Sequence, residues 1–579
     1  MIMFATIRSR IYQLLALLLL SLLGSNLIAA ENNWDKGGMA AIANPYATEA
    51  AREILAKGGH AVDAAIAAHL VLGLVEPQSS GIGGGGFMLV YSRENKALTF
   101  YDGRETAPAR AKVDMFMENG RVISGLQQTG LAIGVPGAVA MYKLAHDEYG
   151  RLPWASLFEP AIKLADEGFV VSPRLAGFLP FMAQRGMLDE NPGAAAYFYP
   201  DGKPLEAGMV RDNPAYAATL RRIADEGPDA FYRGEIAQSM AAAAEMEPHP
   251  GTLTTEDIAG YRAIKRPVLC GPYRDYKICT TSPPSSGGAQ IMMANIYDHL
   301  VDKDATFDDK IAAFVDAQRL AYADRDYYFG DPDEVEIPLD DLLNPRYLEE
   351  RAKQRFKPNE SPTPGDPAMV LRKQEAAYYP GPDTTEETPG TTHLSIVDVD
   401  GNGVALTATV ESPFGTSRFV HGFLLNNELT DFARLVPKTG AKPANAVGPG
   451  KRPRSSMSPT MVLDKDNNLF MLTGSPGGNS IPAYVAKTIL GVTSWGLSAQ
   501  EAADYPNIIA RGQNVRVEVG VGEGQKLADM LNNRGYPVSE RDGENSGIHI
   551  IVVRPEGLQG AADMRREGTV ATVERASSH

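Results

Sequence analysis

The sequence predicts an α+β protein in which a mainly helical stretch precedes a β-rich one. From Gly134 to about Ala377 the apolar residues recur mostly at helical spacing. After Thr391 they alternate as in strands, with turns rich in Gly and Asn between them. Neither an internal repeat nor a clear linker divides the chain, so we expect one large domain rather than several.

The composition is that of a folded protein with an acidic surface. Of the 579 residues, 44% are hydrophobic and 22% are charged, which is enough for a large core. The formal net charge of -16 argues against nucleic acid and anionic membranes as partners. Two cysteines and dispersed histidines do not give the spacing of a zinc site, and we expect neither a metal nor a cofactor.

The first thirty residues have the pattern of a secretory signal peptide. Arg8 and Arg10 form a basic start, residues 14–23 form a short apolar core, and small residues end the segment at Ala30. We therefore expect cleavage near Ala30 and a periplasmic or secreted protein. The alternative is an uncleaved membrane anchor, although the apolar core is short for a spanning helix.

A helical region and a glycine-rich entry to a strand follow the signal. Residues 46–74 have helical periodicity, with a break at Gly58-Gly59. The glycine run at 81–86 precedes a β-rich stretch, where missing side chains let another backbone approach. It does not resemble a phosphate loop, because a strand follows it and no Lys-Ser or Lys-Thr does. Residues 98–101 continue as a strand that ends near Arg104, whose fork shape suits carboxylates.

The middle of the chain is predicted to be mostly helical, with one strand pair at 268–280. The clearest predicted helices are Ala138–Tyr149, Ala215–Glu226, Ala289–Leu300 and Lys310–Tyr328. The strand pair carries both cysteines, Cys270 and Cys279, on either side of a turn. In an oxidising compartment such a pair can bridge the hairpin, but two reduced thiols remain the alternative.

Gly390-Thr391 stands where a long polar loop meets a buried strand. If the chain were cut there, Thr391 would carry a hydroxyl and a free α-amine. An α-amine has a pKa near ~8 and can take the hydroxyl proton, while the β-methyl restricts χ1. The alternative is that Thr391 is only the first residue of a strand, where β-branched residues are common.

The β-rich part begins with a hairpin of residues 394–399 and 404–410 around an Asp-Gly-Asn-Gly turn. The hairpin brings Thr409 close to Thr391, but the register stays open. A glycine pair, Gly477-Gly478, precedes a helix and either binds a developing oxyanion or forms an ordinary turn. The other predicted elements are strands Phe423–Leu425, Thr460–Leu463, Leu469–Thr473, Val515–Val519 and Gly547–Val553, and helices Ile481–Thr493, Gln500–Tyr505 and Gln525–Arg534.

Several sequence blocks together resemble the γ-glutamyltranspeptidase family. The block Thr391-Thr392-His393-Leu394-Ser395-Ile396-Val397-Asp398 is similar to the start of that family's small subunit. The resemblance covers nearly the whole chain after the signal and includes Glu76-Pro77-Gln78 with the glycine run, Gly103-Arg104-Glu105-Thr106-Ala107-Pro108, Ser282-Pro283-Pro284-Ser285-Ser286-Gly287-Gly288, Ala321-Tyr322-Ala323-Asp324-Arg325, Leu425-Asn426-Asn427-Glu428 with Asp431-Phe432, Lys451-Arg452-Pro453, Ser455-Ser456-Met457-Ser458-Pro459-Thr460 and Gly474-Ser475-Pro476-Gly477-Gly478.

The resemblance implies a four-layer αββα N-terminal nucleophile hydrolase. It implies that the precursor cuts itself at Gly390–Thr391 into a large subunit, 31–390, and a small subunit, 391–579, which stay together as a heterodimer within one domain. It further implies that the enzyme takes the γ-glutamyl group from glutathione or a related donor, holds it as an ester on Thr391, and passes it to water or to an amino acid or dipeptide acceptor.

The resemblance also implies a role for each site residue. Thr391 is the nucleophile, Thr409 hydrogen-bonds it, and Gly477 and Gly478 form the oxyanion hole. The donor's α-carboxylate is expected to bind Arg104, Ser455 and Ser456. Its α-ammonium is expected to bind Glu428 and Asp431.

The chain departs from the family pattern in two places. Glu411 stands where many members have Asn, so we expect it only as an additional contact to the donor. Residues 434–444, which would cover the site, form a short segment without an aromatic residue. We therefore expect a site open to water and to bulky donors, with hydrolysis competing strongly against transfer.

Two alternative functions remain at this point. One is an acylase of the same architecture that acts on glutaryl-type side chains; retention of both Glu428 and Asp431 argues against it, since a glutaryl group would leave them unpaired. The other is an uncleaved, inactive binding protein. The presence of Thr391, Thr409, Gly477 and Gly478 argues against it.

Overall fold

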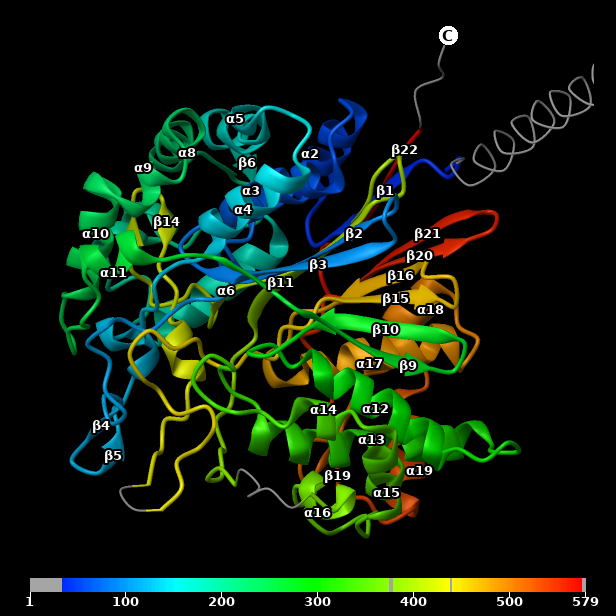
Figure 1. The fold of residues 1–579 in the computed structure, drawn as a ribbon. Coiled ribbons are helices and arrows are strands. Elements are labelled where there is room, and N and C mark those ends of the chain that lie inside the picture. The colour runs from blue at the N-terminus through cyan, green and yellow to red at the C-terminus, as the bar shows by residue number, and fades with distance from the viewer. Residues whose placement is uncertain (1–33, 374–378, 438–439, 575–579) are drawn as a thin grey trace, which may run out of the picture.

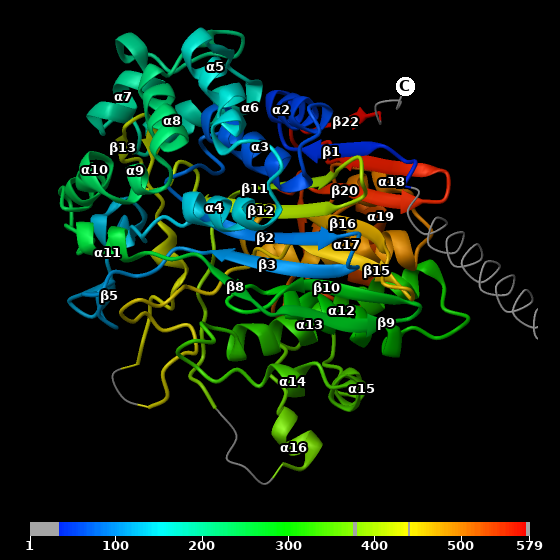
Figure 2. The same ribbon diagram turned by 45° about the horizontal axis from the view of Figure 1, so that its top comes forward.

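Two β-sheets stack face to face at the centre of the structure, and helices cover both outer faces (Figure 1, Figure 2). The structure is a computed structural model that describes residues 34–373, 379–437 and 440–574. The order of layers is helix, sheet, sheet, helix, so the four-layer αββα prediction is confirmed. The predicted signal segment, 1–30, lies outside the described residues.

The first sheet has seven strands, and each is antiparallel to its neighbours. Its centre is the pair β11–β12, with β1 on one side and β2 on the other. In sheet order the strands are β22 (Thr569–Val573), β1 (Gly38–Ile42), β11 (Gly390–Val397), β12 (Gly403–Glu411), β2 (Gly85–Ser92), β3 (Ala97–Gly103) and β8 (Ile264–Arg266).

The second sheet has six strands and is also antiparallel. It packs against the first sheet mainly through β16 and β20, which lie under β11 and β12. In sheet order the strands are β21 (Gly557–Ala562), β20 (His549–Arg554), β16 (Leu469–Gly474), β15 (Thr460–Asp464), β10 (Tyr276–Thr281) and β9 (Val268–Tyr273).

The helices form the two outer layers (Figure 2). Against the first sheet lie α2 (Pro45–Ala56), α3 (Ala61–Val75) and α4 (Ala138–Tyr149). Against the second lie α12 (Gly287–Leu300), α17 (Ile481–Thr493) and α18 (Ala499–Asp504), with α13 (Phe307–Tyr328) packed on α12. Among the described residues, none of the helices has both the length and the apolar character to cross a bilayer.

The remaining elements surround these layers. The helices are α5 (Glu159–Glu167), α6 (Pro173–Gln184), α7 (Pro192–Phe198), α8 (Pro214–Glu226), α9 (Asp229–Tyr232), α10 (Gly234–Ala244), α11 (Thr255–Gly260), α14 (Leu339–Leu342), α15 (Pro345–Lys353), α16 (Pro367–Leu371) and α19 (Gly524–Asn533). The short strands are β4 (Met117–Glu118), β5 (Arg121–Val122), β6 (Phe169–Val170), β7 (Val210–Arg211), β13 (Phe419–Val420), β14 (Phe423–Leu424), β17 (Ile508–Ile509), β18 (Val515–Glu518) and β19 (Val538–Arg541).

Successive side chains of β11 lie on opposite faces of the sheet, and the face decides which core each side chain contacts. Leu394 and Ile396 belong to the core beneath the α2–α3 layer, whereas Val397 belongs to the core between the sheets. Successive strand side chains point to opposite faces, so Thr391 lies on the same face as Val397, toward the second sheet. The nucleophile candidate therefore lies between the two sheets.

Most predicted elements are present within a residue or two of their expected bounds. The break at 58–59 separates α2 from α3, and α4 and α17 match the predicted ranges. The prediction that the last strand ends near Val553 was wrong, since β21 and β22 follow it, and β1 was missed. β21 reads Gly-Leu-Gln-Gly-Ala-Ala, which lacks the β-branched and aromatic residues that mark a strand.

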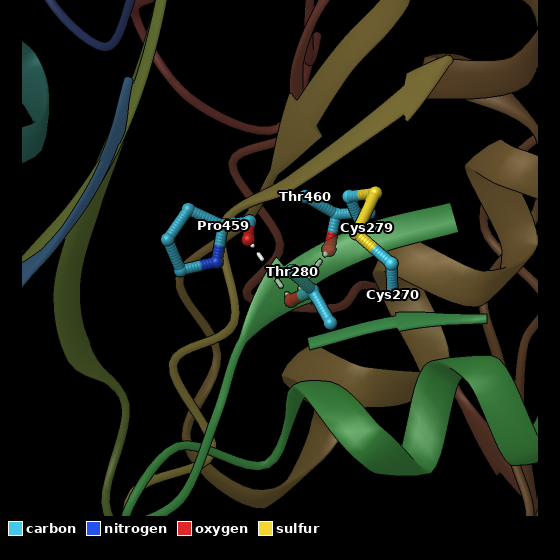
Figure 3. The surroundings of a disulfide bond; sticks show 5 residues. All are labelled: Cys270, Cys279, Thr280, Pro459 and Thr460. Carbon is cyan, nitrogen blue, oxygen red and sulfur yellow. Dashed lines mark hydrogen bonds between the residues drawn. A yellow bond between two sulfur atoms is a disulfide. The ribbon is translucent and has the colours of Figure 1, made fainter. Parts of the chain in front are cut away.

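The two cysteines form a disulfide across the β9–β10 hairpin (Figure 3). Cys270 and Cys279 are directly opposite partners in the register, with their Cα atoms 4.1 Å apart. The next residue, Thr280, donates a hydrogen bond of 3.0 Å to the Pro459 carbonyl at the start of β15. Of the two possibilities that the sequence left open, the structure therefore has the bridge.

We expect the Cys270→Ala/Cys279→Ala double variant to lose about 2–3 kcal/mol of unfolding free energy, because the bridge closes a short loop in the unfolded chain. Denaturant titration measures this loss, with the native protein kept oxidised as the control. When the protein with both cysteines is denatured and alkylated without reductant, neither cysteine should be labelled. Labelling of both would contradict the bridge.

Candidate active site

Thr391 lies near the start of β11, directly opposite Thr409 of β12. The ladder shifts register between Gly390 and Thr391, where Gly390 pairs with Glu411 instead of residue 410. This bulge turns the Gly390 carbonyl toward the Thr409 side chain. The distances below are those of the single chain with the Gly390–Thr391 peptide bond intact.

The Thr409 hydroxyl connects the two groups that a self-cleavage would involve. It donates to the Gly390 carbonyl oxygen at 2.8 Å and accepts a hydrogen bond of 3.3 Å from the Thr391 hydroxyl. The Glu411 backbone N–H donates to the same Thr409 oxygen at 2.8 Å. Both threonines are buried, so water does not compete strongly for these contacts.

The pair Gly477 and Gly478 joins β16 to α17, and both positions require glycine. Their φ angles are +141° and +55°. A Cβ on Gly477 would lie 2.4 Å from the Tyr484 ring, and a Cβ on Gly478 would lie 2.5 Å from the Glu387 carbonyl oxygen. The backbone of Gly478 therefore comes unusually close to the segment that precedes the Gly390–Thr391 bond.

Arg104 forms a buried ion-pair cluster with both of the predicted ammonium-binding acids. Its guanidinium donates to the Glu428 carboxylate and, at 2.7 Å, to Asp431 Oδ2. It also donates to the Pro453 and Arg454 carbonyls at 3.1 and 2.9 Å. The three side chains that we assigned to opposite ends of a donor are thus in direct contact with one another.

The cluster holds more acid than base. Glu105 Oε2 lies 3.9 Å from the Arg104 guanidinium, and neither of its carboxylate oxygens has a hydrogen-bond partner within the described chain. The same holds for Glu428 Oε2 and Asp431 Oδ1. Burial raises the pKa of Glu428 and of Asp431 well above their usual range, although Arg104 opposes both shifts. The site therefore has spare acceptor oxygens that suit a cation.

Ser455 and Ser456 are held by loops far away in the sequence. Ser455 N–H donates to the Pro284 carbonyl at 2.8 Å. Ser456 N–H donates to the Glu387 carboxylate at 2.7 Å, and the Ser456 hydroxyl accepts from Arg325 at 2.7 Å. Arg325 also bonds Glu387 at 2.6 Å. Glu387, which lies three residues before Gly390 in the chain, thus accepts the hydrogen bond of the Ser456 N–H.

Glu411 is buried beside these groups in a strained backbone conformation. Its φ is +74°, which a non-glycine residue adopts only when its surroundings hold it there. Its carboxylate accepts from Thr388 N–H at 3.0 Å and from the Ser412 hydroxyl. Burial raises the pKa of Glu411, and repulsion from its carboxylate contributes to the raised pKa values of Glu428 and Asp431.

The predicted site residues meet around one small cavity, which we call the donor cavity. Its volume is about 10 Å³, no more than the room for one water, and Glu387 and Thr388 of the segment before Gly390 line it. The predicted residues that line it are Arg104, Thr391, Thr409, Glu411, Glu428, Asp431, Ser455 and Gly478. The other two, Gly477 and Ser456, are their direct neighbours in the chain.

Sequence reasoning missed three residues that contact this site. Arg566 donates to the Thr391 carbonyl at 2.8 Å, and its contact spans 175 residues, so no local pattern marks it. Glu387 lies in the polar loop before the bond and gave no signal. Arg325 belongs to a block that carries the family resemblance, and that membership was the one available hint. No group of three or more metal-binding side chains is found in the described part of the chain.

Comparisons with known proteins agree over nearly the whole chain. A sequence profile described as gamma-glutamyltranspeptidase matches residues 47–573. The chain is 38% identical to the glutathione hydrolase proenzyme of Escherichia coli, over 92% of this chain and 90% of that protein. It is 36% identical to the glutathione hydrolase proenzyme of Bacillus subtilis, over 92% and 91% of the two chains.

A solved structure shares the fold. The crystal structure of cephalosporin acylase from Bacillus halodurans matches with a TM-score of 0.82 and 28% identity, over 93% of this chain and 96% of that one. A profile match across most of the chain and relatives above 30% identity place it in one family. The chain belongs to the γ-glutamyltranspeptidase family.

Proposed function

We propose that this chain is a γ-glutamyl hydrolase and transferase that matures by cutting itself at Gly390–Thr391. The observation that carries the proposal is the Thr409 hydroxyl, which bonds both the Gly390 carbonyl and the Thr391 hydroxyl. A hydrogen bond to that carbonyl draws electron density from the carbon that the Thr391 oxygen would attack. Relatives named as proenzymes support self-cleavage.

In maturation the Thr391 oxygen adds to the Gly390 carbonyl carbon, and the Gly390–Thr391 C–N bond then breaks. The Thr391 nitrogen keeps its electron pair and takes up the hydroxyl proton, and the large subunit remains attached as an ester. Water hydrolyses this ester, which leaves residues 31–390 and 391–579 as two subunits of one domain. The freed α-amine of Thr391 is then available as the base for turnover.

In turnover the γ-glutamyl carbonyl of glutathione or a similar donor takes the place of the Gly390 carbonyl. Thr391 attacks it, the amine leaves with the proton, and water or an amine acceptor cleaves the ester. The backbone N–H groups of Gly477 and Gly478 are proposed to bind the developing oxyanion. Each hydrogen-bond donor to an oxyanion typically increases the rate by a factor of ~10²–10³.

The charges of the donor cavity favour a donor that carries an α-ammonium. The unpartnered oxygens of Glu428 and Asp431 would accept from that ammonium, and Arg104 with Ser455 and Ser456 would bind the α-carboxylate. Arg104 already pairs with both acids. A donor with an α-ammonium and an α-carboxylate would therefore place its two charges among groups that are already paired with one another. Glu411 adds a further acid, which strengthens the preference for a cationic group.

An acylase for glutaryl-type side chains is the second candidate, and the similarity to a cephalosporin acylase structure favours it. A glutaryl group has no ammonium, so it would leave the acidic excess uncompensated. We therefore place γ-glutamyl donors first.

We also infer export from the cell through the N-terminal signal, with cleavage near Ala30. The basic start, short apolar core and small residues of that segment support this inference. The disulfide also supports it, because such bonds persist in oxidising compartments.

We expect Thr391→Ala to remain one uncut chain without activity, because both steps need its hydroxyl. Thr391→Ser should still cleave, but more slowly, since the β-methyl no longer restricts χ1. A denaturing gel separates one precursor band from the two subunit bands. The matched control is Thr392→Ala, which removes a buried hydroxyl with no partner in the described chain and should cleave normally. Normal cleavage of Thr391→Ala would refute the proposal.

We expect the native enzyme to prefer γ-glutamyl-p-nitroanilide over glutaryl-p-nitroanilide. In Asp431→Asn the kcat/KM for the γ-glutamyl donor should fall by about 10–100-fold, because one charge-assisted hydrogen bond to the ammonium is lost. The kcat/KM for the glutaryl donor should fall much less. Asp298→Asn, at an exposed ion pair, is the control. Faster release from the glutaryl donor would favour the acylase.

We expect hydrolysis to compete strongly with transfer, because the segment 434–444 carries no aromatic side chain to cover the donor. Residues 438–439 lie outside the described part of this segment. The ratio of free glutamate to γ-glutamyl-glycylglycine, measured at rising glycylglycine concentration, checks this expectation. Dominant transfer at low acceptor concentration would show it to be wrong.

A further inference from the structure

Arg566 is a buried cation without an ion-pair partner among the described residues. The residue is 8% exposed. Its guanidinium donates to the backbone carbonyls of Thr391, Asn545 and Ser546, at 2.8, 3.1 and 3.2 Å, and to the Asn545 side-chain oxygen at 3.3 Å. All of these acceptors are neutral. Because burial disfavours a charge that has no opposite charge beside it, an unpaired buried cation points to a function.

The surrounding backbone makes room for this guanidinium and fixes its place. Arg566 lies in the turn between β21 and β22, and its backbone N–H donates to the Asp563 carbonyl at 3.2 Å. A Cβ on Gly547 would lie 2.5 Å from Arg566 Cδ and 2.7 Å from its Nε, so a side chain at position 547 would clash with the arginine. Two loops therefore hold the cation against β11.

The contact with Thr391 places the cation near the nitrogen that self-cleavage would free. Arg566 Nη1 lies 2.8 Å from the Thr391 carbonyl oxygen. The nitrogen and the carbonyl oxygen of one extended residue are about 3 Å apart, so the Thr391 nitrogen lies within about 6–7 Å of the charge. The pairing of Thr391 with Thr409 joins β11 to β12 and does not involve the segment before the bond. Under the proposed cleavage this arrangement would therefore persist.

The acids of the donor cavity act on the same nitrogen. Those that line the cavity with Thr391 are Glu411, Glu428 and Asp431. Negative charge favours the protonated form of an amine and so raises its pKa. Arg104 offsets part of this effect, but it is already paired with two of these acids. Arg566 has no such pair, so no contact cancels its effect on the amine.

The other titratable groups around Thr391 and Arg566 come from several elements. They are Glu76 after α3, Glu105 after β3, Arg174 on α6, Glu387 before the bond, His393 on β11, Tyr484 on α17, His549 on β20, Asp563 after β21 and Glu567 in the turn. Burial lowers the pKa of both histidines and raises the pKa of Tyr484, so these three are neutral at pH 7. Burial, with Arg174 nearby, lowers the pKa of Arg566 to about 9, so its guanidinium is charged at pH 7.

We propose that Arg566 is a positioning residue whose charge keeps the α-amine of the cleaved Thr391 neutral at physiological pH. An α-amine ordinarily has a pKa near ~8, and surrounding acids would leave it mostly protonated at pH 7. A general base acts only in its unprotonated form, so a nearby cation makes this amine a better base. The proposal rests on the proposed self-cleavage and γ-glutamyl transfer, and it adds the group that tunes the base.

The test measures kcat/KM for γ-glutamyl-p-nitroanilide against pH in the matured native enzyme, Arg566→Gln and Arg566→Lys. Gln keeps a donor for the Thr391 carbonyl but removes the charge, whereas Lys keeps the charge. Loss of the cation raises the pKa of the amine, so in Arg566→Gln the acidic limb should move up by about one pH unit. At pH 7 kcat/KM should then fall about five- to tenfold, and at pH 9 it should be nearly native. Arg566→Lys should retain the native limb.

The matched control is Arg554→Gln, because Arg554 lies on β20 over the Phe470 ring and does not contact Thr391. It should leave the limb in place. If Arg566→Gln lowers kcat/KM equally at all pH values, its role is structural and the inference fails. The inference also fails if Arg554→Gln moves the limb as far.

A second measurement needs only the native matured enzyme. Reductive methylation modifies neutral amines and not hydroxyls, and mass spectrometry of the peptide that begins at Thr391 follows its rate against pH. The pKa of this amine should lie below that of a free threonine peptide in the same solution, and an equal or higher value overturns the inference even if Arg566→Gln is not cut. If the native chain stays uncut or releases no p-nitroaniline, the proposed function itself fails, which is a separate result.

Discussion

The candidate active site depends on one constraint, the register of β11 against β12. Two central strands of a seven-stranded sheet are held by neighbours on both sides, so neither can slip without moving every buried side chain to the wrong face. That register sets Thr391 opposite Thr409. The bulge at Gly390 then brings the carbonyl and both hydroxyls together. A rigid sheet therefore positions chemistry that a loop would hold less accurately.

The second organising feature is a buried acidic excess around Arg104. Three buried carboxylates, from Glu105, Glu428 and Asp431, act on one guanidinium, and a fourth, from Glu411, acts on Glu428 and Asp431. Burial disfavours charge, and it raises the pKa of Glu105 to about 7. Such an arrangement costs stability unless a cation completes it, which is a reason for its presence at a binding site rather than in an ordinary core.

The precursor segment connects these two features. Glu387 binds the Ser456 N–H and Arg325, Thr388 binds Glu411, and the Gly390 carbonyl binds Thr409. The uncut chain thus fills the donor cavity with its own polar groups. Under the proposed cleavage at Gly390–Thr391, the same partners would become available to a substrate.

The sequence alone determined the α+β class, most of the helices and the family, and it proposed ten site residues, because these depend on local periodicity and on blocks whose order is visible in the chain. It left open the register of Thr391 and Thr409 and the pairing of the cysteines. It missed β1 and β21, which contain few β-branched residues, and also β22, although four of its five residues are β-branched. Only the tertiary structure decided that Arg104 pairs with Glu428 and Asp431 and that Arg566 contacts the Thr391 carbonyl. Those contacts join residues up to 327 positions apart, and burial and charge at such distances are properties of the packed chain rather than of any local pattern.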